Sequence, residues 1–274
     1  MLFTFVGCSG VGKNTIIGDL LKMHKDSYDL LPTVTTRAMR PGESQGNPYL
    51  FVSKEEFEKM IADGEMYEYE RIHENLYGGS RKILKGKLAE NKILLKDIDV
   101  LGSQTLKKAF KGELSVISMF LYVNDVEIIL DRLRKRGDSE EEIQKRKKRF
   151  DMEMSLSGTG DYLINNIVRE DTGSLIDAII AAETQKSVYR LAEQCELPKE
   201  EEVNALYEEA MKGASLARVE MAFNGEEILI LEGAERYAAA IRAGAFIQKH
   251  FINALSKDVK AAENTGAWDA LFSA

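Results

Sequence analysis

The sequence predicts an α/β fold with a mostly parallel sheet, followed by a small α+β segment. Strand and helix patterns alternate over residues 1–190, as they do in chains that build parallel sheets with flanking helices. A glycine-rich loop, "GCSGVGK", joins the first apolar run to a helix-like segment. A later apolar run ends in two acids, "LLKDID", and open parallel sheets bind ligands at such strand ends.

The elements of residues 1–190 follow from the hydrophobic period and from stop signals. Apolar runs predict buried strands, alternation around Glu74-Asn75 predicts an antiparallel pair, and amphipathic stretches ending at glycine predict helices. The expected strands cover residues 2–7, 30–36, 65–79 (as a pair), 92–100, 114–123 and 161–166. The expected helices cover residues 13–25, 54–64, 81–91, 125–137, 139–155 and 171–194.

The pattern changes near Cys195, and residues 191–274 are expected to form an accessory α+β domain. A helix is predicted over 196–213, with Pro198 near its first turn. Asn224-Gly225 lies between two apolar runs and predicts a hairpin over 217–233. A helix over 234–244, a strand over 245–252 and a partly ordered tail over 261–274 complete the segment.

Composition and charge exclude several classes of protein. No run of apolar residues is long enough to span a membrane. The apolar N-terminus has no basic leader, and Cys8 and Cys195 make no disulfide framework, so a reducing cytoplasm is expected. The net charge is −8, and residues 191–274 contribute −7 of it (8 basic and 15 acidic residues). We expect no nucleic-acid partner, because such binding needs basic surface, and we interpret the acidic segment as solvated surface.

The loop "GCSGVGK" has the spacing of a phosphate-binding loop, in Gly7, Gly12 and Lys13. Glycines let the backbone N–H groups turn toward phosphate oxygens, the following helix adds its dipole, and the lysine reaches the outer phosphates. The alternative is a plain strand-to-helix turn. The expected nucleotide-binding residues are Gly7, Ser9, Gly10, Val11, Gly12, Lys13, Asn14 and Thr15. Asn14 is a departure, because a Ser or Thr usually follows the lysine and contacts magnesium.

Asp97 and Asp99 lie two residues apart at the end of a predicted strand, so they share one face of it. A carboxylate at that place suits Mg²⁺, which prefers one or two carboxylates together with phosphate oxygens. The alternative is a pair of acids that only solvate a loop.

A second anion site is predicted downstream. Arg37 and Arg40, three residues apart, and Tyr49 could together bind one phosphate dianion. Tyr77 lies on a glycine-rich turn, and Glu68 on an alternating strand could accept two hydrogen bonds from a base edge such as that of guanine. A basic surface loop and an exposed strand acid are the alternatives.

Several motifs together resemble guanylate kinases: "GCSGVGK", "TTRAMRPGE", "GNPYLFVSKEEFEKMI", "YGGSR", "DIDVLG" and "RLRKRGDSEEEIQKR". The resemblance covers residues 2–188 and implies a P-loop nucleoside-monophosphate kinase fold. It implies a core in residues 1–190, a GMP-binding insert near 33–90 and a lid near 132–150. It also implies transfer of the γ-phosphate of ATP to GMP with Mg²⁺.

The resemblance further implies the role of single residues. Lys13 would contact the β- and γ-phosphates of ATP, and Asp97 would serve the magnesium. Arg136 and Arg146 would close from the lid, with Arg132 as a weaker candidate. The GMP phosphate would be held by Arg37, Arg40, Tyr49 and Tyr77, and the base by Thr33, Glu68, Gly79 and Asp99.

Besides Asn14, the sequence departs from the guanylate kinase pattern in four places. Cys8 replaces the usual proline of the loop, and Leu101 replaces the usual glutamine after "DIDV". The lid between Arg136 and Arg146 is one residue short. Gly79 stands where the family has a Ser or Thr that touches guanine, and one lost hydrogen bond is worth about 1 kcal/mol. Base selectivity is therefore the property most affected.

The segment "ILILEGAERYAAAIRAG" resembles the strand–loop–helix of ParB-like and sulfiredoxin-like domains. That resemblance implies a phosphate site at Gly233 and Arg236, and hence a second nucleotide site that regulates the kinase. The alternative is a small packing domain with Arg236 on its surface.

Three readings of function remain open at this point. The first is an active kinase for GMP, and the second is the same kinase with dGMP or a modified guanine nucleotide as acceptor. The third is a catalytically weak nucleotide- or protein-binding module, although such modules usually lose the loop lysine or the lid arginines. The sequence also leaves open whether the chain forms a homo-oligomer.

Overall fold

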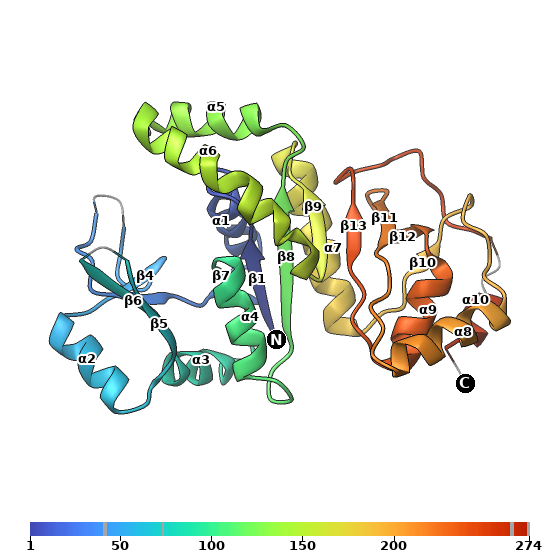
Figure 1. Cartoon of the computed structure of the whole chain (residues 1–274), viewed down its shortest axis with the longest axis horizontal. Coiled ribbons are helices and arrows are strands. Elements are labelled where there is room, and N and C mark those ends of the chain that lie inside the picture. Colours follow the sequence, from blue (N-terminus) through green and yellow to red (C-terminus); the bar gives the residue numbers. More distant parts are fainter. Residues whose placement is uncertain (41–42, 73, 264–265, 273–274) are drawn as a thin grey trace. The chain divides into compact units, whose positions relative to one another are not determined.

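The computed structural model describes residues 1–40, 43–72, 74–263 and 266–272. The chain divides into two compact units. The first unit comprises Met1–Val6 and Ile17–Ser118, and the second comprises Gly7–Ile16 and Met119–Ala274 (Figure 1). Both α1 (Lys13–Met23) and β8 (Val116–Tyr122) pass from one unit into the other.

The first unit contains three parallel strands in the order β1-β7-β2. β1 is Leu2–Val6, β7 is Ile93–Asp97 and β2 is Tyr28–Leu30. The side chains of β1 are fully buried, as expected for a strand covered on both faces. β7 leads into α4 (Val100–Ala109), whose Leu106 packs in one core cluster with Leu2 and Leu94.

An insert with its own sheet follows β2 in the first unit. Its strand order is β4-β3-β6-β5. The bounds are β3 Thr33–Thr35, β4 Tyr49–Phe51, β5 Met66–Ile72 and β6 Asn75–Ser80, with helices α2 Lys54–Ala62 and α3 Arg81–Leu88. A capping box between Ser53 and Glu56 starts α2, whose Phe57 is buried against the sheet with Val34 and Leu76.

The second unit contains a mostly parallel group of strands in the order β8-β9-β13-β11-β12-β10. Only the β11–β12 hairpin is antiparallel among the described pairs of this unit. The bounds are β9 Tyr162–Asn165, β10 Arg190–Leu191, β11 Val219–Phe223, β12 Ile228–Glu232 and β13 Lys249–Phe251. The helices are α5 Val126–Arg136, α6 Glu140–Ser155, α7 Arg169–Gln185, α8 Glu200–Met211, α9 Ala234–Ala243 and α10 Gly266–Ala270, with a short 3₁₀ turn at Ser157–Thr159.

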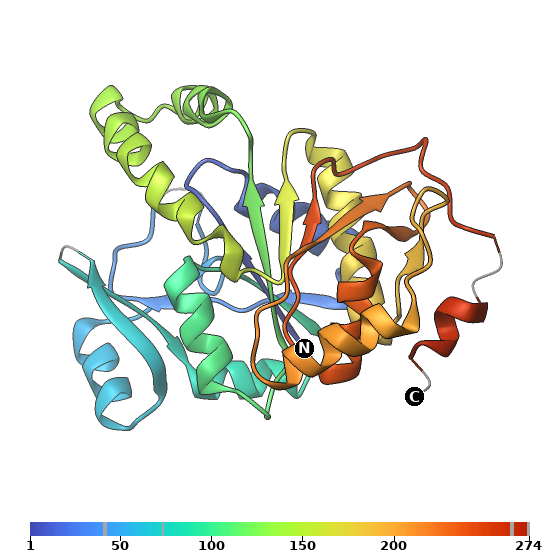
Figure 2. The same cartoon turned by 45° about the vertical axis from the view of Figure 1, so that its right-hand side comes forward.

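The strands after residue 190 continue the sheet of the strands before it. β13 pairs in parallel with β9, His250 opposite Leu163, and the two strands lie side by side in Figures 1 and 2. β9 is therefore an interior strand, and its backbone groups on that side are paired rather than exposed. The predicted division at residue 190 does not coincide with a boundary between the two compact units.

Most elements appear where the sequence predicts them, and the differences have local causes. The strand predicted over 30–36 is two strands, β2 and β3, because Pro32 between them has no N–H to donate. The helix predicted over 171–194 ends at Gln185, where Lys186 adopts a left-handed conformation (φ 54°). Helix α4 and the short strand β4 were not predicted.

The tail predicted as partly ordered is anchored through Trp268. Its side chain is 1% exposed, its Nε1 donates to the carbonyl of Tyr189 (2.9 Å), and its ring stacks with Tyr237. Residues 264–265 and 273–274 of this tail, like Pro41, Gly42 and His73 of the predicted insert, lie outside the described residues. No helix among the described residues is long and apolar enough to cross a membrane.

Candidate active site

The glycine-rich loop forms in the second unit as the sequence predicts, between β1 and α1. Gly7 has φ +126°, and a Cβ at this residue would lie 2.1 Å from the carbonyl oxygen of Leu121, so no larger residue fits there. Lys13 Nζ donates to the carbonyl of Gly7 (2.7 Å) and to that of Cys8 (3.3 Å). Asn14 and Thr15 are exposed in the first turn of α1.

Two groups hold the carbonyl of Val11 in this loop. Asn166 Nδ2 donates to it (2.6 Å), and so does Arg132 Nη1 (3.1 Å). Arg132 Nη2 also donates to the carbonyls of Asn166 (3.1 Å) and Ile167 (3.2 Å). Arg132, the weaker lid candidate, thus ties the loop to the turn after β9. Burial lowers its pKa from the usual arginine value.

The two main lid candidates meet on one carboxylate. Asp138 accepts hydrogen bonds from Arg136, with Nε at 2.8 Å from Oδ1, and its Oδ2 lies 3.4 Å from Nε of Arg146. The bond from Arg136 holds the pKa of Asp138 below its usual value. Arg146 Nη1 also donates to Oγ of Ser9 in the loop. The second unit therefore joins Arg136 and Arg146 through Asp138, and joins Arg146 to the loop that carries Lys13.

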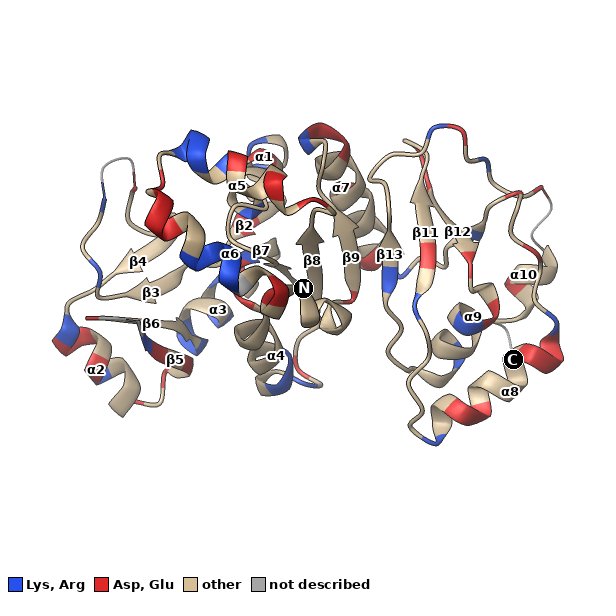
Figure 3. Ribbon diagram, turned by 45° about the horizontal axis from the view of Figure 1, so that its top comes forward, with Lys and Arg blue, Asp and Glu red and all other residues tan. Residues whose placement is uncertain are grey.

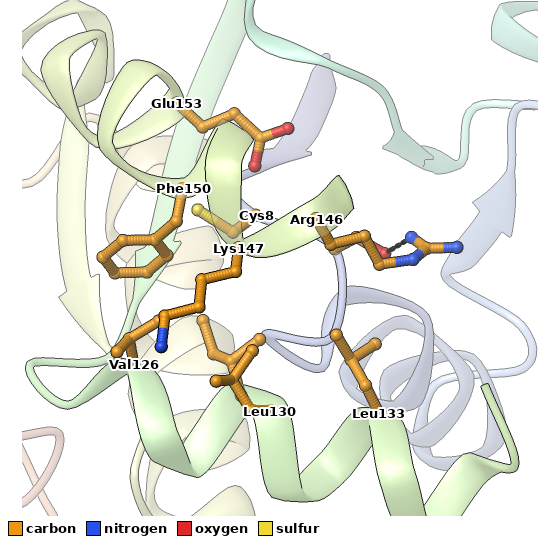
Figure 4. Close-up of a pocket in the computed structure, with 10 residues that line it drawn as sticks. Cys8, Val126, Leu130, Leu133, Arg146, Lys147, Phe150 and Glu153 are labelled. Atoms are coloured by element: carbon orange, nitrogen blue, oxygen red, sulfur yellow. Dashed lines mark hydrogen bonds between the residues drawn. The ribbon is translucent and has the colours of Figure 1, made fainter. Parts of the chain in front are cut away.

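A small cavity of about 50 Å³ lies between the loop, α5 and α6. Figure 4 shows Phe150 and Lys147 on one side of it and Arg146, bonded to Ser9, on another. Burial, and secondarily a hydrogen bond with Glu153, raises the pKa of the Cys8 thiol to about 12. The thiol therefore stays protonated at neutral pH, and Cys8 acts as a packing residue.

Charge along α6 changes sign, as Figure 3 shows. Its first turn carries Glu140, Glu141 and Glu142, which suits the positive end of the helix dipole, and Lys145–Lys148 follow. Lys145 pairs with Glu141 at the surface. Most of these charges lie on a solvated helix face, so Arg146 is distinguished by its contact with the loop.

The residues predicted to bind the phosphate of GMP lie in the first unit. The guanidinium of Arg37 lies 5.1 Å from the ring centroid of Tyr49, and the rings of Tyr49 and Tyr77 are 6.1 Å apart. Arg37 Nη2 donates to Oε1 of Glu43 (2.7 Å), and this bond raises the pKa of Arg37 and lowers that of Glu43. Arg40 is exposed, and its backbone N–H donates to the same carboxylate (2.8 Å).

Glu68 lies in a half-buried position beside the first turn of α4. A Cβ on Gly102 would be 3.3 Å from its Oε2. Burial raises the pKa of Glu68 to about 7, with the charge of Lys96 acting in the opposite direction and that of Asp99 in the same one. Asp99 is the N-cap of α4 and accepts from the N–H of Gly102 (2.7 Å), so one of its two oxygens is already engaged.

Asp97 is the last residue of β7 and lies opposite Phe5 of β1, the strand that leads into the loop. Its charge is the second cause, after burial, of the raised pKa of Tyr49. Among the described residues, no group of three or more His, Cys, Asp or Glu side chains could hold a metal ion. A single strand-end carboxylate suits an ion that takes its other ligands from phosphates and water.

Sequence reasoning missed three polar residues of these clusters. Asp138 follows Arg136 by two residues, and Glu43 belongs to a quoted motif, so both had a local signal. Asn166 follows a predicted strand, as Asp97 does. Each of the three forms a hydrogen bond with a residue that was predicted, and none belongs to a ligand-binding motif of its own.

The ParB-like and sulfiredoxin-like resemblance implied a phosphate site at Gly233 and Arg236. In the structure, carboxylates lie beside Arg236. Arg236 Nη1 lies 2.8 Å from an oxygen of Glu235, and its Nη2 lies 3.8 Å from an oxygen of Glu232. Its guanidinium folds over Gly233, where a Cβ would lie 2.4 Å from Nη2. Two carboxylates beside the arginine favour the packing alternative over an anion site.

Comparison with known proteins identifies the family of the chain. The guanylate kinase family model matches residues 2–183. A guanylate kinase of Idiomarina loihiensis is 41% identical over 68% of this chain and 88% of its own length. One of Thermotoga maritima is 32% identical over the same shares. A crystal structure of guanylate kinase from Anaplasma phagocytophilum has a TM-score of 0.51 and 28% identity, over 67% of this chain and 85% of that chain. The chain therefore belongs to the guanylate kinase family of ATP:GMP phosphotransferases.

Proposed function

We propose that the chain transfers the γ-phosphoryl group of MgATP to the phosphate of GMP or dGMP through the two clusters described above. The observation that carries this assignment is the group Arg136–Asp138–Arg146, with Arg146 bonded to Ser9 of the phosphate loop. Phosphoryl transfer needs positioned positive charge more than covalent chemistry, and these residues supply it beside the loop.

On the donor side, the loop N–H groups bind the phosphates of ATP, and Lys13 moves from the loop carbonyls to the β- and γ-phosphates. We assign Asp97 to Mg²⁺. When bound, the ion neutralises charge on the phosphates. Asn14 replaces the usual hydroxyl ligand, and we expect it to act through water.

On the acceptor side, Arg37, Arg40, Tyr49 and Tyr77 hold the GMP phosphate. Glu43 then has to share or release Arg37, which it binds at 2.7 Å. An oxygen of the acceptor phosphate attacks the γ-phosphorus, and the bond between that phosphorus and the β–γ bridging oxygen breaks, which gives ADP and GDP.

The base is held by Glu68, whose carboxylate accepts from N1–H and the 2-amino group of guanine, together with Thr33 and Asp99. These residues contact the base and none is assigned to the ribose, so dGMP stays within the proposal. The reading as a binding module is less well supported, because Lys13, Asp97, Arg136 and Arg146 are all retained.

The test is ADP formation from MgATP with GMP, dGMP, AMP, CMP and UMP in turn. The wild type is compared with Lys13→Ala and with a matched control, Lys22→Ala, which removes an exposed lysine from the other end of α1. We expect turnover with GMP and dGMP, its loss in Lys13→Ala and its retention in Lys22→Ala.

Turnover with none of these acceptors, in a folded protein that binds ATP, would reject the proposal in favour of a binding module. Turnover that Lys13→Ala leaves intact would reject the role of the loop.

A further inference from the structure

Two buried hydrogen-bond donors lie beside Glu68 and have no role in the assignments above. Tyr67 precedes Glu68 on β5 and is 9% exposed, and Lys96 on β7 is 1% exposed. The charge of Glu68 acts on both side chains: it adds to the effect of burial on the pKa of Tyr67 and opposes the effect of burial on that of Lys96. Burying a hydroxyl or an ammonium group is costly unless it finds a partner, so both residues call for an explanation.

The Tyr67 hydroxyl occupies the space of a side chain at position 79. Glu68 pairs with Gly79 across β5 and β6, with a register shift at Tyr67. A Cβ on Gly79 would lie 2.0 Å from the Tyr67 hydroxyl oxygen. Glycine is therefore required at 79 as long as Tyr67 is present.

The position of this hydroxyl is fixed by packing. The Tyr67 ring meets Phe110 edge-on, with centroids 5.5 Å apart, and belongs to the core cluster of Leu2 and Leu94. Its hydroxyl oxygen is buried and has no hydrogen-bond partner within the described residues. A buried hydroxyl without a partner is rare in proteins, so this one calls for an explanation beyond packing.

Lys96 lies on β7, in the other sheet of this unit, and has N–H donors that no partner among the described residues takes up. Its Nζ donates to Oγ1 of Thr33 at 2.9 Å. Within the described part of the chain this uses one of the three N–H groups of an ammonium.

These groups match one edge of guanine. That edge presents N1–H and a 2-amino group as donors next to O6 as an acceptor, and a carboxylate beside two donors is complementary to it. We propose that the hydroxyl of Tyr67 and the ammonium of Lys96 are specificity-determining donors to O6 of the acceptor base, beside Glu68. This inference deepens the proposed function and rests on it.

The pair also explains how other bases would be rejected. Adenine has an amino group at position 6, which would face two donors and leave them unpaired. A site built to hydrogen-bond one group discriminates strongly against an analogue that lacks it. Gly79 has no hydroxyl where the family has that of a Ser or Thr. In this proposal, the hydroxyl of Tyr67 takes its place.

The test uses Tyr67→Phe and Lys96→Met in the full-length chain, with kcat/KM measured for GMP, 6-thio-GMP and IMP. Sulfur at position 6 is a weak acceptor, whereas IMP keeps O6 and loses the 2-amino group. A neutral hydrogen bond is worth less than one to a charged group. We therefore expect kcat/KM for GMP to fall about fivefold in Tyr67→Phe and about 30-fold in Lys96→Met.

The decisive readout is the ratio of activities. The preference for GMP over 6-thio-GMP should shrink in both variants, and the preference for GMP over IMP should stay within twofold of the wild type. Matched controls are Tyr69→Phe and Lys85→Met, which alter exposed residues of the same unit and should change neither ratio.

An unchanged preference over 6-thio-GMP in both folded variants would overturn this inference while leaving the kinase assignment intact. Equal losses with all three acceptors would also overturn it, because they would indicate a role in folding or positioning only. Absence of turnover with GMP in the wild type would instead reject the proposed function itself.

Discussion

The two sites that we propose, the phosphate loop and the base pocket, differ in the groups that would bind their ligands. The loop works mainly through backbone, in a conformation that only glycine allows at Gly7 (φ +126°), together with one lysine. The proposed base pocket uses side chains from three strands: Glu68 and Tyr67 on β5, Thr33 on β3 and Lys96 on β7. Backbone recognition depends on spacing along the chain, whereas side-chain recognition depends on which residues the fold brings together.

This difference governs how each region responds to change. Substitutions at the loop should affect phosphoryl transfer with every acceptor. Substitutions in the base pocket should affect the choice of acceptor.

Arg146→Ala should lower kcat by about 100-fold with any acceptor, because it removes a positive charge at the transferring phosphoryl group. Steady-state kinetics with saturating MgATP and GMP checks this. Arg134→Ala is the matched control, because Arg134 is a surface residue of α5 paired with Asp131. A loss of less than threefold in Arg146→Ala would remove this residue from the transfer step.

The pH dependence of acceptor use should follow Glu68. Burial raises its pKa to about 7, and only the carboxylate accepts both donors of guanine. As pH falls through 7 the side chain gains a proton, so kcat/KM for GMP should fall about tenfold between pH 8 and pH 6.

The matched variant for this prediction is Glu68→Gln. The GMP phosphate also gains a proton near pH 6, and the variant separates that effect from the titration of Glu68. We expect a much flatter pH profile in Glu68→Gln. Identical profiles in the two proteins would show that another group is responsible.

Asp138→Asn should lower kcat about fivefold and leave the KM for ATP within twofold. The change replaces a charged acceptor for Arg136 and Arg146 with a neutral one, which weakens hydrogen bonds by about 1 kcal/mol. Steady-state kinetics measures both constants. An unchanged kcat would mean that the lid arginines do not need Asp138 for their alignment.

Trp268→Ala should have the smallest effect on activity and a clear effect on stability. Trp268 is buried against Tyr189 and Tyr237, and truncation of a buried aromatic residue costs about 3–5 kcal/mol. Thermal unfolding should shift to lower temperature while kcat/KM at 20 °C stays constant. A selective loss of GMP or ATP use would instead link the C-terminal segment to one of the two clusters.

The two regions also differ in how far the sequence predicted them. The loop, its lysine and the strand-end Asp97 follow from spacing and from an apolar run, and the structure has each in its expected element. Asp99 was predicted as a base contact, and that role stays a prediction, but its function as the N-cap of α4 was missed. The sequence pattern did not distinguish an aspartate that binds a ligand from one that caps a helix, because both kinds occur at the end of a strand.

The resemblance named Thr33, Glu68, Gly79 and Asp99 as base contacts, but the sequence could not add Lys96 or Tyr67 to them, because strand pairing and packing decide which distant residues meet. Thr33 and Lys96 are 63 residues apart and share a hydrogen bond. The departure at Gly79 was visible, but the residue that fills its space, Tyr67, lies across a strand pair with a bulge. Position within an alternating strand gave no reason to single out Tyr67 from Tyr69.

The separation of the two regions is tested most directly by calorimetric titration of GMP, without ATP, into wild type, Lys13→Ala and Glu68→Gln. Our account predicts that Lys13→Ala, although inactive in transfer, binds GMP within twofold of wild type, whereas Glu68→Gln binds it at least tenfold more weakly. Loss of GMP binding in Lys13→Ala with retention in Glu68→Gln would contradict it, and would place recognition of the acceptor at the phosphate loop.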